Sequence, residues 1–174
     1  MHMALEMKHC MQCGSELVLK ELKDEGMVPY CPTCKDFRFP VFNVAVSMVV
    51  LNETKDETLL IKQYGKDSYI LVAGYVNKGE DAEDAVIREV KEEMGLDVQD
   101  LSFNHSHYFS KSNTLMLNFT AIVEGKSHPN WEIDSYAWFP LEQAREKIRS
   151  QSLAEAFLLG FLDGKYDFTY ADKK

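Results

Sequence analysis

The chain has 174 residues, of which 45% are hydrophobic and 27% are charged, a balance that excludes a disordered protein and predicts one principal folded domain. Its 19 basic and 28 acidic residues give a net charge of −9, which opposes loose, charge-driven binding to nucleic acid or to an anionic membrane and means that a phosphate substrate needs a cation to approach. No apolar run reaches the roughly 18 residues of a membrane span, and the first residues lack the layout of a secretory signal, so we expect a cytoplasmic protein with no membrane contact.

All four cysteines lie near the start of the chain, as the pairs Cys10/Cys13 and Cys31/Cys34 with 17 residues between them. Two such pairs can fold back and present four thiolates tetrahedrally to one zinc ion, and Gly14 relieves the tight turn after the first pair. The alternatives are two disulfides, which a reducing cytoplasm disfavours, or a redox pair, for which the strand-helix-strand context is missing. The spacing therefore predicts a structural Zn²⁺ site.

The composition changes to a β-rich run after Phe39, and we place a domain boundary at Pro40, with a small zinc ribbon over residues 1–39 and a second domain over 40–174. Mixed strands with helices on both sides predict an α+β fold, a layered α/β/α sandwich with a mixed sheet. We expect strands at 41–51, 58–62, 69–73, 101–109, 114–123 and 136–139, and helices at 82–94, 142–149 and 152–162.

The helix at 82–94 is delimited by Asp81, a favourable N-cap, and by Gly95, which stands where a C′ glycine ends a helix. Winding it at about 100° per residue gives one apolar arc. The arc comprises Ala82, Val86, Ile87, Val90 and Met94. Glu89, Glu92 and Glu93 are related by steps of three and four residues, so their carboxylates form a cluster beside this arc.

Three glutamates on a helix are usually a solvated charged face. Here they border the apolar arc, and like charges at these spacings destabilise the helix by a few tenths of a kcal/mol per pair unless a cation lies among them. Carboxylate oxygens select hard cations, so the cluster predicts a site for Mg²⁺ or Mn²⁺.

The segment from Gly74 to Leu96 resembles the Nudix box: a glycine, five residues, a glutamate, seven residues, then Arg-Glu-apolar-x-Glu-Glu-x-Gly-apolar. The nine matching positions are Gly74, Glu80, Arg88, Glu89, Val90, Glu92, Glu93, Gly95 and Leu96. The resemblance implies that Glu89, Glu92 and Glu93 bind the catalytic divalent ions with help from the Gly74 carbonyl, while Arg88 and Glu80 hold the carboxylates in place. Which carboxylate accepts the proton of the attacking water stays open.

A zinc-binding cysteine set followed by this box is similar to the NADH pyrophosphatase group of Nudix hydrolases, over roughly residues 9–140. Members of that group carry a Ser-Gln-Pro-Trp segment just after the box, and here Ser106-His107-Tyr108-Phe109 stands at that place. Only the serine matches, with Phe109 keeping an aromatic ring, so this segment does not establish a preference for nicotinamide. Ser106, Tyr108 and Phe109 are the candidate substrate contacts; the two aromatic rings could equally belong to the core.

Four further residues are candidates. Glu132 precedes the last strand, where the resemblance implies an additional acid with a metal or base role, and Asp134 competes with it. His105 and His107 alternate in one strand and share a face, which makes a structural pair the first interpretation and a catalytic pair the second.

The leading hypothesis is a divalent-metal hydrolase of the diphosphate bond in NADH, NAD, ADP-ribose, FAD or a similar dinucleotide. One alternative is a Nudix domain that senses nucleotides without turnover, against which the intact glutamates argue. Another is an enzyme directed to RNA caps, against which the near-neutral charge of residues 1–43 argues, so nucleic acid is an unexpected partner. Apolar residues on more than one face of the helix at 152–162 suggest a homodimer, with burial in the same chain as the alternative.

Overall fold

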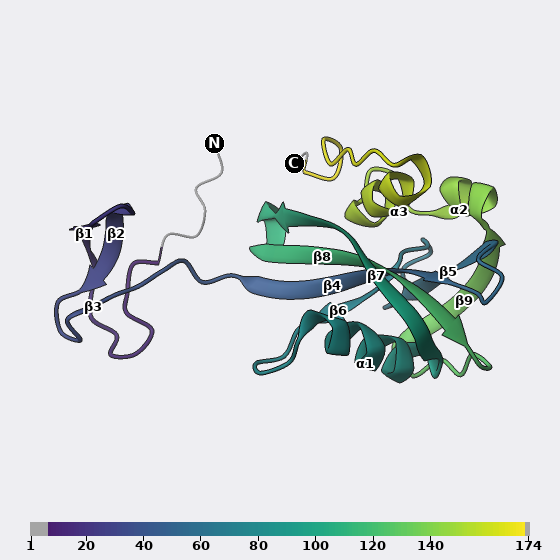
Figure 1. The fold of residues 1–174 in the computed structure, drawn as a ribbon, viewed down its shortest axis with the longest axis horizontal. Coiled ribbons are helices and arrows are strands. Elements are labelled where there is room, and N and C mark those ends of the chain that lie inside the picture. The colour runs from purple at the N-terminus through teal and green to yellow at the C-terminus, as the bar shows by residue number, and fades with distance from the viewer. Residues whose placement is uncertain (1–6, 173–174) are drawn as a thin grey trace. The chain divides into compact units, whose positions relative to one another are not determined.

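The computed structural model describes residues 7–172, and the chain divides into two compact units, one ending at Phe42 and the other beginning at Asn43 (Figure 1). Residues 1–6, which belong to the expected ribbon and for which no secretory signal was expected, lie outside the described residues. Within residues 7–172, no helix is both long and apolar enough to cross a membrane.

The first unit is a three-stranded antiparallel sheet in the order β1-β2-β3. Its strands are β1 (Val18–Leu22), β2 (Gly26–Cys31) and β3 (Asp36–Phe37). The cysteine pairs occupy two turns of the same form, in which the amide of Gly14 bonds to the Cys10 carbonyl and the amide of Lys35 bonds to the Cys31 carbonyl, both at 2.8 Å. Gly14 and Lys35 both have a positive φ, so the second turn holds a lysine in the conformation that the first gives to a glycine.

The second unit is built on a six-stranded mixed sheet with the strand order β7-β8-β4-β5-β9, and β6 pairs with β4. β4 runs parallel to β8, and the other pairs are antiparallel. The strands are β4 (Asn43–Leu51), β5 (Glu57–Gln63), β6 (Val72–Tyr75), β7 (Asp97–Phe109), β8 (Thr114–Glu124) and β9 (Ile133–Pro140), and a 3-10 turn, η1 (Ser110–Ser112), joins β7 to β8.

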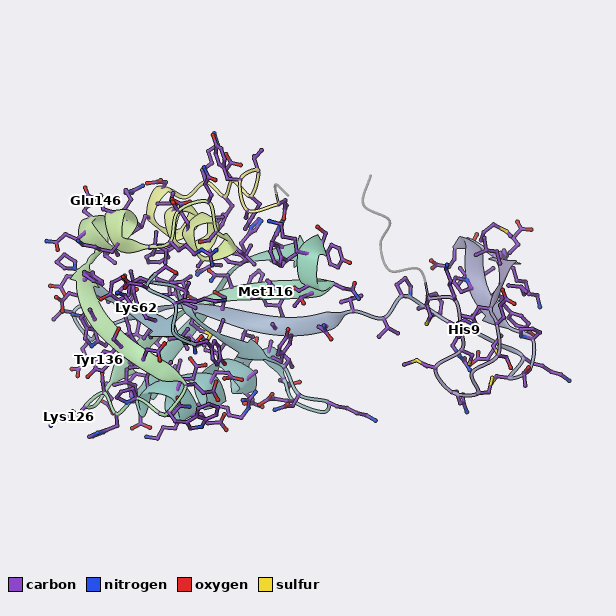
Figure 2. The ribbon with its side chains drawn as sticks, turned by 180° about the vertical axis from the view of Figure 1, so that it is seen from behind. His9, Lys62, Met116, Lys126, Tyr136 and Glu146 are labelled. Carbon is purple, nitrogen blue, oxygen red and sulfur yellow. The ribbon has the colours of Figure 1, made fainter. Side chains whose placement is uncertain are left out.

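Helices cover both faces of this sheet, which confirms the expected layered sandwich (Figure 1). Helix α1 (Ala82–Met94) packs on one face, and α2 (Leu141–Lys147) and α3 (Leu153–Asp163) pack on the other. Apart from Asn43 and Ser47, β4 is apolar because its residues enter the two cores: Val46 and Met48 face α1, whereas Val49 faces α3. Figure 2 shows the same division, with Met116 on the α3 side of the sheet and Tyr136 on the α1 side.

Helix α1 follows the expected limits, although its cap differs in detail. Gly95 ends the helix with φ 71°, as expected, but the Asp81 side chain makes no capping hydrogen bond. The placement of Ile87 in the apolar arc was wrong, because its side chain is 46% exposed, and Ala85 is fully buried instead. The small alanine allows the helix to approach the sheet at that position.

The strand expected at 69–73, which is β6, begins later than expected. Tyr69 and Ile70 form isolated bridges to Ile148 and Ile61, and the regular pairing of β6 with β4 starts only at Val72 and continues to Tyr75. This shift places Gly74 inside the strand, directly opposite Val46.

The apolar side chains of α3 pack within the same chain. Phe157 and Leu158 are fully buried, and Leu153, Phe161 and Leu162 pack against the same core cluster. The observation that suggested a homodimer is thus accounted for by intramolecular burial, the alternative weighed from the sequence.

Candidate active site

The four cysteines form a compact cluster. Their sulfur atoms all lie within 4.8 Å of one another, with Sγ–Sγ distances of 3.9 Å for Cys10–Cys34 and 3.5 Å for Cys13–Cys31. Tetrahedral zinc with Zn–S bonds of about 2.3 Å requires sulfurs about 3.8 Å apart, whereas a disulfide requires about 2.05 Å. The cluster therefore fits a closed four-thiolate zinc site, and the cysteines are not disulfide-bonded.

Arg38 lies beside this cluster, and the sequence alone gave it no role. Its Nε donates to the Cys10 sulfur at 3.3 Å, while its other nitrogens bond to Asp36 and Gln12. The backbone amide of Cys13 and the Arg38 guanidinium lower the pKa of Cys10 to about 6, which favours the thiolate.

The carboxylates of α1 are organised around Arg88. Its Nε and Nη2 bind both oxygens of Glu80, at 2.7 and 3.0 Å, while Nη1 reaches Glu89 at 2.7 Å and Glu92 at 3.2 Å. Nη2 also donates to the Tyr75 carbonyl at 3.0 Å. The guanidinium, followed by the backbone amide of Asn77, lowers the pKa of Glu80 to about 2. Arg88 thus connects the loop before the helix, the strand β6 and two of the clustered glutamates.

Gly74 leaves the space into which Glu89 projects. A Cβ at position 74 would lie 2.0 Å from the Glu89 carboxyl carbon, so any larger residue would displace this side chain. Burial raises the pKa of Glu89, although Arg88 opposes the shift.

Glu93 is the most buried member of the cluster, at 4% exposure. Gln63 Nε2 donates to its Oε1 at 3.1 Å, and its Oε2 is buried with no hydrogen-bond partner. Burial, together with the charges of Glu89, Glu132 and Glu92, raises its pKa to about 7. An unpartnered carboxylate oxygen among like charges fits a divalent cation, because a cation would give that oxygen a partner and would neutralise the repulsion between the carboxylates.

The chemistry of these donors suits Mg²⁺ or Mn²⁺, although the side chains are not arranged as a finished coordination shell. In the described part of the chain, only the cysteines bring three or more such ligand atoms within 4.8 Å of one another. Arg88 engages both Glu89 and Glu92, so cation binding requires these carboxylates to turn; the Glu92 side chain, 58% exposed, has room to do so.

Glu132 lies in the loop before β9, which is tied to α1 by a hydrogen bond from the Asn130 amide to the Glu93 carbonyl at 2.9 Å. Its charge raises the pKa of both Glu89 and Glu93. The Tyr64 hydroxyl donates to its Oε2 at 2.9 Å. Asp134, the alternative acid, instead accepts the backbone amide of Gly65 at 2.6 Å. The sequence reasoning missed Gln63 and Tyr64, which come from β5 and the turn after it.

The candidate substrate residues of β7 all follow a register shift between Phe103 and His105. After the shift, Ser106 pairs with Leu117, which packs on the α1 side of the sheet. Leu117 pairs in turn with Val46, and Val46 pairs with Gly74, so Ser106 lies in the same row across the sheet as Gly74. Ser106 and Tyr108 are both exposed, and strand alternation puts them on the α1 face of the sheet. Phe109 pairs with Thr114 at the end of the strand and is partly buried.

The pair His105 and His107 lies on the opposite face of the sheet from Ser106 and Tyr108. His105 stacks on Tyr166 at 4.4 Å, and His107 stacks on Phe168 at 3.9 Å and lies 2.9 Å from Asp172. Both aromatic partners belong to the core on the α3 side. The structural interpretation of the pair fits these contacts, and the two rings lie across the sheet from the glutamates.

The comparisons with known proteins define the class. The family model described as the NUDIX domain matches residues 41–158, a span that includes the glutamate helix and Gly74. The chain therefore belongs to the Nudix family.

Among curated proteins, the chain is similar to proteins named NAD-capped RNA hydrolase NudC. One, from Pseudomonas aeruginosa, is 34% identical over 151 residues, covering 84% of this chain and 52% of the relative. Another, from Stutzerimonas stutzeri, is 32% identical over 152 residues, covering 84% of this chain and 53% of the relative. The chain thus spans about half the length of these curated relatives.

Solved structures share the fold. A NUDIX hydrolase from Nitrosomonas europaea aligns with a TM-score of 0.63 at 20% identity, over 93% of this chain and 96% of that one. A MutT protein from Methanosarcina mazei aligns with a TM-score of 0.57 at 21% identity, over 71% and 94%.

Proposed function

We propose that this protein hydrolyses the diphosphate bond of a nucleoside diphosphate joined to another group, with NADH, NAD, ADP-ribose or FAD as the substrate class. The single observation that carries the proposal is the buried, unpartnered Oε2 of Glu93 within a cluster of four acids, because such an oxygen is costly unless a cation binds it. The intact cluster also argues against a nucleotide sensor without turnover.

In this proposal, Glu89, Glu92 and Glu93 bind the divalent ions together with the Gly74 carbonyl. Mg²⁺ or Mn²⁺ bound there would neutralise the diphosphate and lower the pKa of a water molecule near phosphorus. Arg88 orients Glu89 and Glu92, and Glu80 orients Arg88 through two hydrogen bonds. Glu132 contributes a further carboxylate, as an additional ligand or as the base.

We assign Ser106 and Tyr108 to the substrate side, whereas Phe109, the third candidate, follows the alternation of His105 and His107 and has no such support. Support comes from the register shift in β7, which turns Ser106 and Tyr108 towards the α1 face while the neighbouring histidines turn away. The exposed Tyr108 ring offers a stacking surface for a base at a place where few core contacts would be lost.

We further propose that Cys10, Cys13, Cys31 and Cys34 hold one structural zinc ion in a ribbon over residues 1–39, separate in role from the hydrolase domain over 40–174. Four thiolates leave no open coordination position for water, so this site has no part in the hydrolysis.

A second candidate substrate is RNA carrying a 5′ NAD cap, which the names of the curated relatives favour. The net charge of −9 opposes strong binding to the RNA body, so we expect the cap to be cleaved no faster than the free dinucleotide.

The test is a panel of NADH, NAD, ADP-ribose, FAD, diadenosine polyphosphates and 5′-NAD RNA, each assayed with Mg²⁺ and with Mn²⁺. We expect mononucleotide products, with ¹⁸O from labelled water on one phosphate. If no member of the panel is cleaved with either ion, the proposed function is wrong.

A further inference from the structure

The last residue of β5 and the first two residues after it each contact an acidic residue. The Gln63 side chain donates to Glu93, the Tyr64 hydroxyl donates to Glu132, and the Gly65 backbone amide donates to Asp134. A register shift between Lys62 and Gln63 marks the point where this segment leaves its regular pairing with β9. One short segment is therefore in contact with both the helix α1 and the loop before β9.

Tyr64 adopts an unusual conformation to make its contact. The amide of Lys66 bonds to the Gln63 carbonyl at 3.1 Å, and the two central residues of this turn, Tyr64 and Gly65, have φ values of 55° and 68°. Positive φ at both positions is the requirement of a type I′ turn, in which asparagine or glycine is favoured at the first place and a tyrosine is strained. Turn formation alone gives no reason for a tyrosine here, whereas the hydrogen bond to Glu132 does.

The loop that carries Glu132 is anchored on its other side to α1. The Asn130 amide bonds to the Glu93 carbonyl at 2.9 Å, and the Glu132 amide bonds to the Asn130 side chain at 2.9 Å. The backbone of Glu132 is thereby fixed near the end of the glutamate helix, but its carboxylate is repelled by Glu89 and Glu93. A neutral donor such as a phenol can hold that carboxylate in place without cancelling its charge, whereas lysine or arginine would compete with a cation.

We infer that Tyr64 is a positioning residue that holds the Glu132 carboxylate against Glu89 and Glu93, so that Glu132 completes the divalent-cation site. Asp134 has a different role, because it fixes the turn itself through Gly65. This inference rests on the proposed function, of which it specifies one part.

The experiment is a double-mutant cycle on the full chain, with Mn²⁺ alone as the probe and its binding followed by electron paramagnetic resonance. Tyr64→Phe removes only the hydroxyl from a side chain that is 65% exposed. Loss of one hydrogen bond to a carboxylate corresponds to roughly two- to tenfold weaker Mn²⁺ binding. In a Glu132→Gln background, the same substitution should change nothing further. Equal effects in both backgrounds, or no effect in either, would overturn the inference.

Tyr64→Asn separates positioning from folding. Asparagine suits the turn, so the melting temperature should hold or rise, while Mn²⁺ binding should weaken as in Tyr64→Phe. A lower melting temperature in parallel with weaker binding would assign Tyr64 a structural role only and would also overturn the inference. The matched control is Tyr170→Phe, in the C-terminal segment, which should leave Mn²⁺ binding unchanged.

Hydrolysis of ADP-ribose is measured on the same proteins to keep the two proposals distinguishable. If the parent hydrolyses no substrate of the panel but the Mn²⁺ cycle shows the expected coupling, the proposed function fails and the positioning role stands. If the parent is active and the cycle shows no coupling, the proposed function stands and the positioning role fails.

Discussion

The cysteine cluster and the glutamate cluster both bring acidic side chains close together, but they differ in how the ligand atoms are arranged. The cysteine sulfurs stand at distances that suit a tetrahedral ion, and two matching turns fix them there. Arg88 bridges two of the glutamates, Glu89 and Glu92, and Glu93, the most buried of them, keeps an oxygen with no partner. A finished shell is what a structural metal needs, whereas an incomplete one leaves positions for water and substrate.

The largest effect expected from this comparison is that of removing zinc. The small ribbon sheet has few buried side chains, so without metal residues 7–42 should lose their structure, while the second unit keeps its own two cores. Elemental analysis should show one zinc per chain, and hydrogen exchange after chelation should show loss of protection in the ribbon alone. Zinc absent from protein purified without chelator, or protection lost equally in both units, would contradict the closed-site account.

The next largest effect is that of Glu93→Gln on hydrolysis. An amide is a neutral and weaker ligand, so the rate should fall at least a few hundredfold, corresponding to about 3 to 4 kcal/mol in the barrier. The substitution also removes a buried charge from beside like charges, so the melting temperature should hold or rise. Glu83→Gln, an exposed position in the first turn of the same helix, is the matched control and should change neither quantity.

A smaller effect concerns the pH dependence of stability without divalent ions. The pKa of Glu93 is raised from 4.5 to about 7, so the folded protein binds more protons than the unfolded chain between these values, and stability must fall as pH rises through this window. The loss is at most roughly 3 kcal/mol, or about 5 to 10 °C in melting temperature.

Thermal scans at pH 5 and pH 8 in the presence of a chelator of divalent ions measure this slope. Glu93→Gln should flatten it, and saturating Mg²⁺ should raise the melting temperature more at pH 8 than at pH 5, because the cation favours the charged carboxylates. A slope of equal size in the Glu93→Gln variant would show that other groups cause it.

The smallest effect is expected at Tyr108. If its exposed ring stacks on a base, Tyr108→Ala should raise KM about three- to tenfold with little change in kcat, whereas Tyr108→Phe, which keeps the ring, should resemble the parent. Identical KM values for both variants would remove Tyr108 from the substrate site.

The comparison also shows what the sequence could predict. The two cysteine pairs and the glutamate helix are set by local spacing, and the family inferred from them is confirmed, as is the layered fold inferred from the order of strands and helices. Ile87 was misplaced because helical winding gives only the direction of a side chain, while exposure depends on how far the covering strands extend. The face occupied by His107 depends on an extra residue in β7, and a shift of one residue reverses every side chain after it.

The contacts that the sequence did not predict join residues that are far apart in the chain. Gln63 meets Glu93 through the packing of α1 on the sheet, and Tyr64 meets Glu132 beside the pairing of β5 with β9. The spacing of residues within a single segment does not predict such contacts. The C-terminal aromatics that cover His105 and His107 are likewise brought there by the packing of α3.

The central claim is that the carboxylates of α1 form an open site for a divalent cation. The most direct test is to titrate Mn²⁺ into protein that has no divalent ion at these carboxylates, and to measure both the amount of bound Mn²⁺ and the melting temperature. The account predicts saturable binding with a matching rise in melting temperature, retained in Glu83→Gln and strongly weakened in Glu93→Gln. If Mn²⁺ binds the parent and the Glu93→Gln variant equally, or stabilises neither, the assignment of this helix as the catalytic metal site must be abandoned.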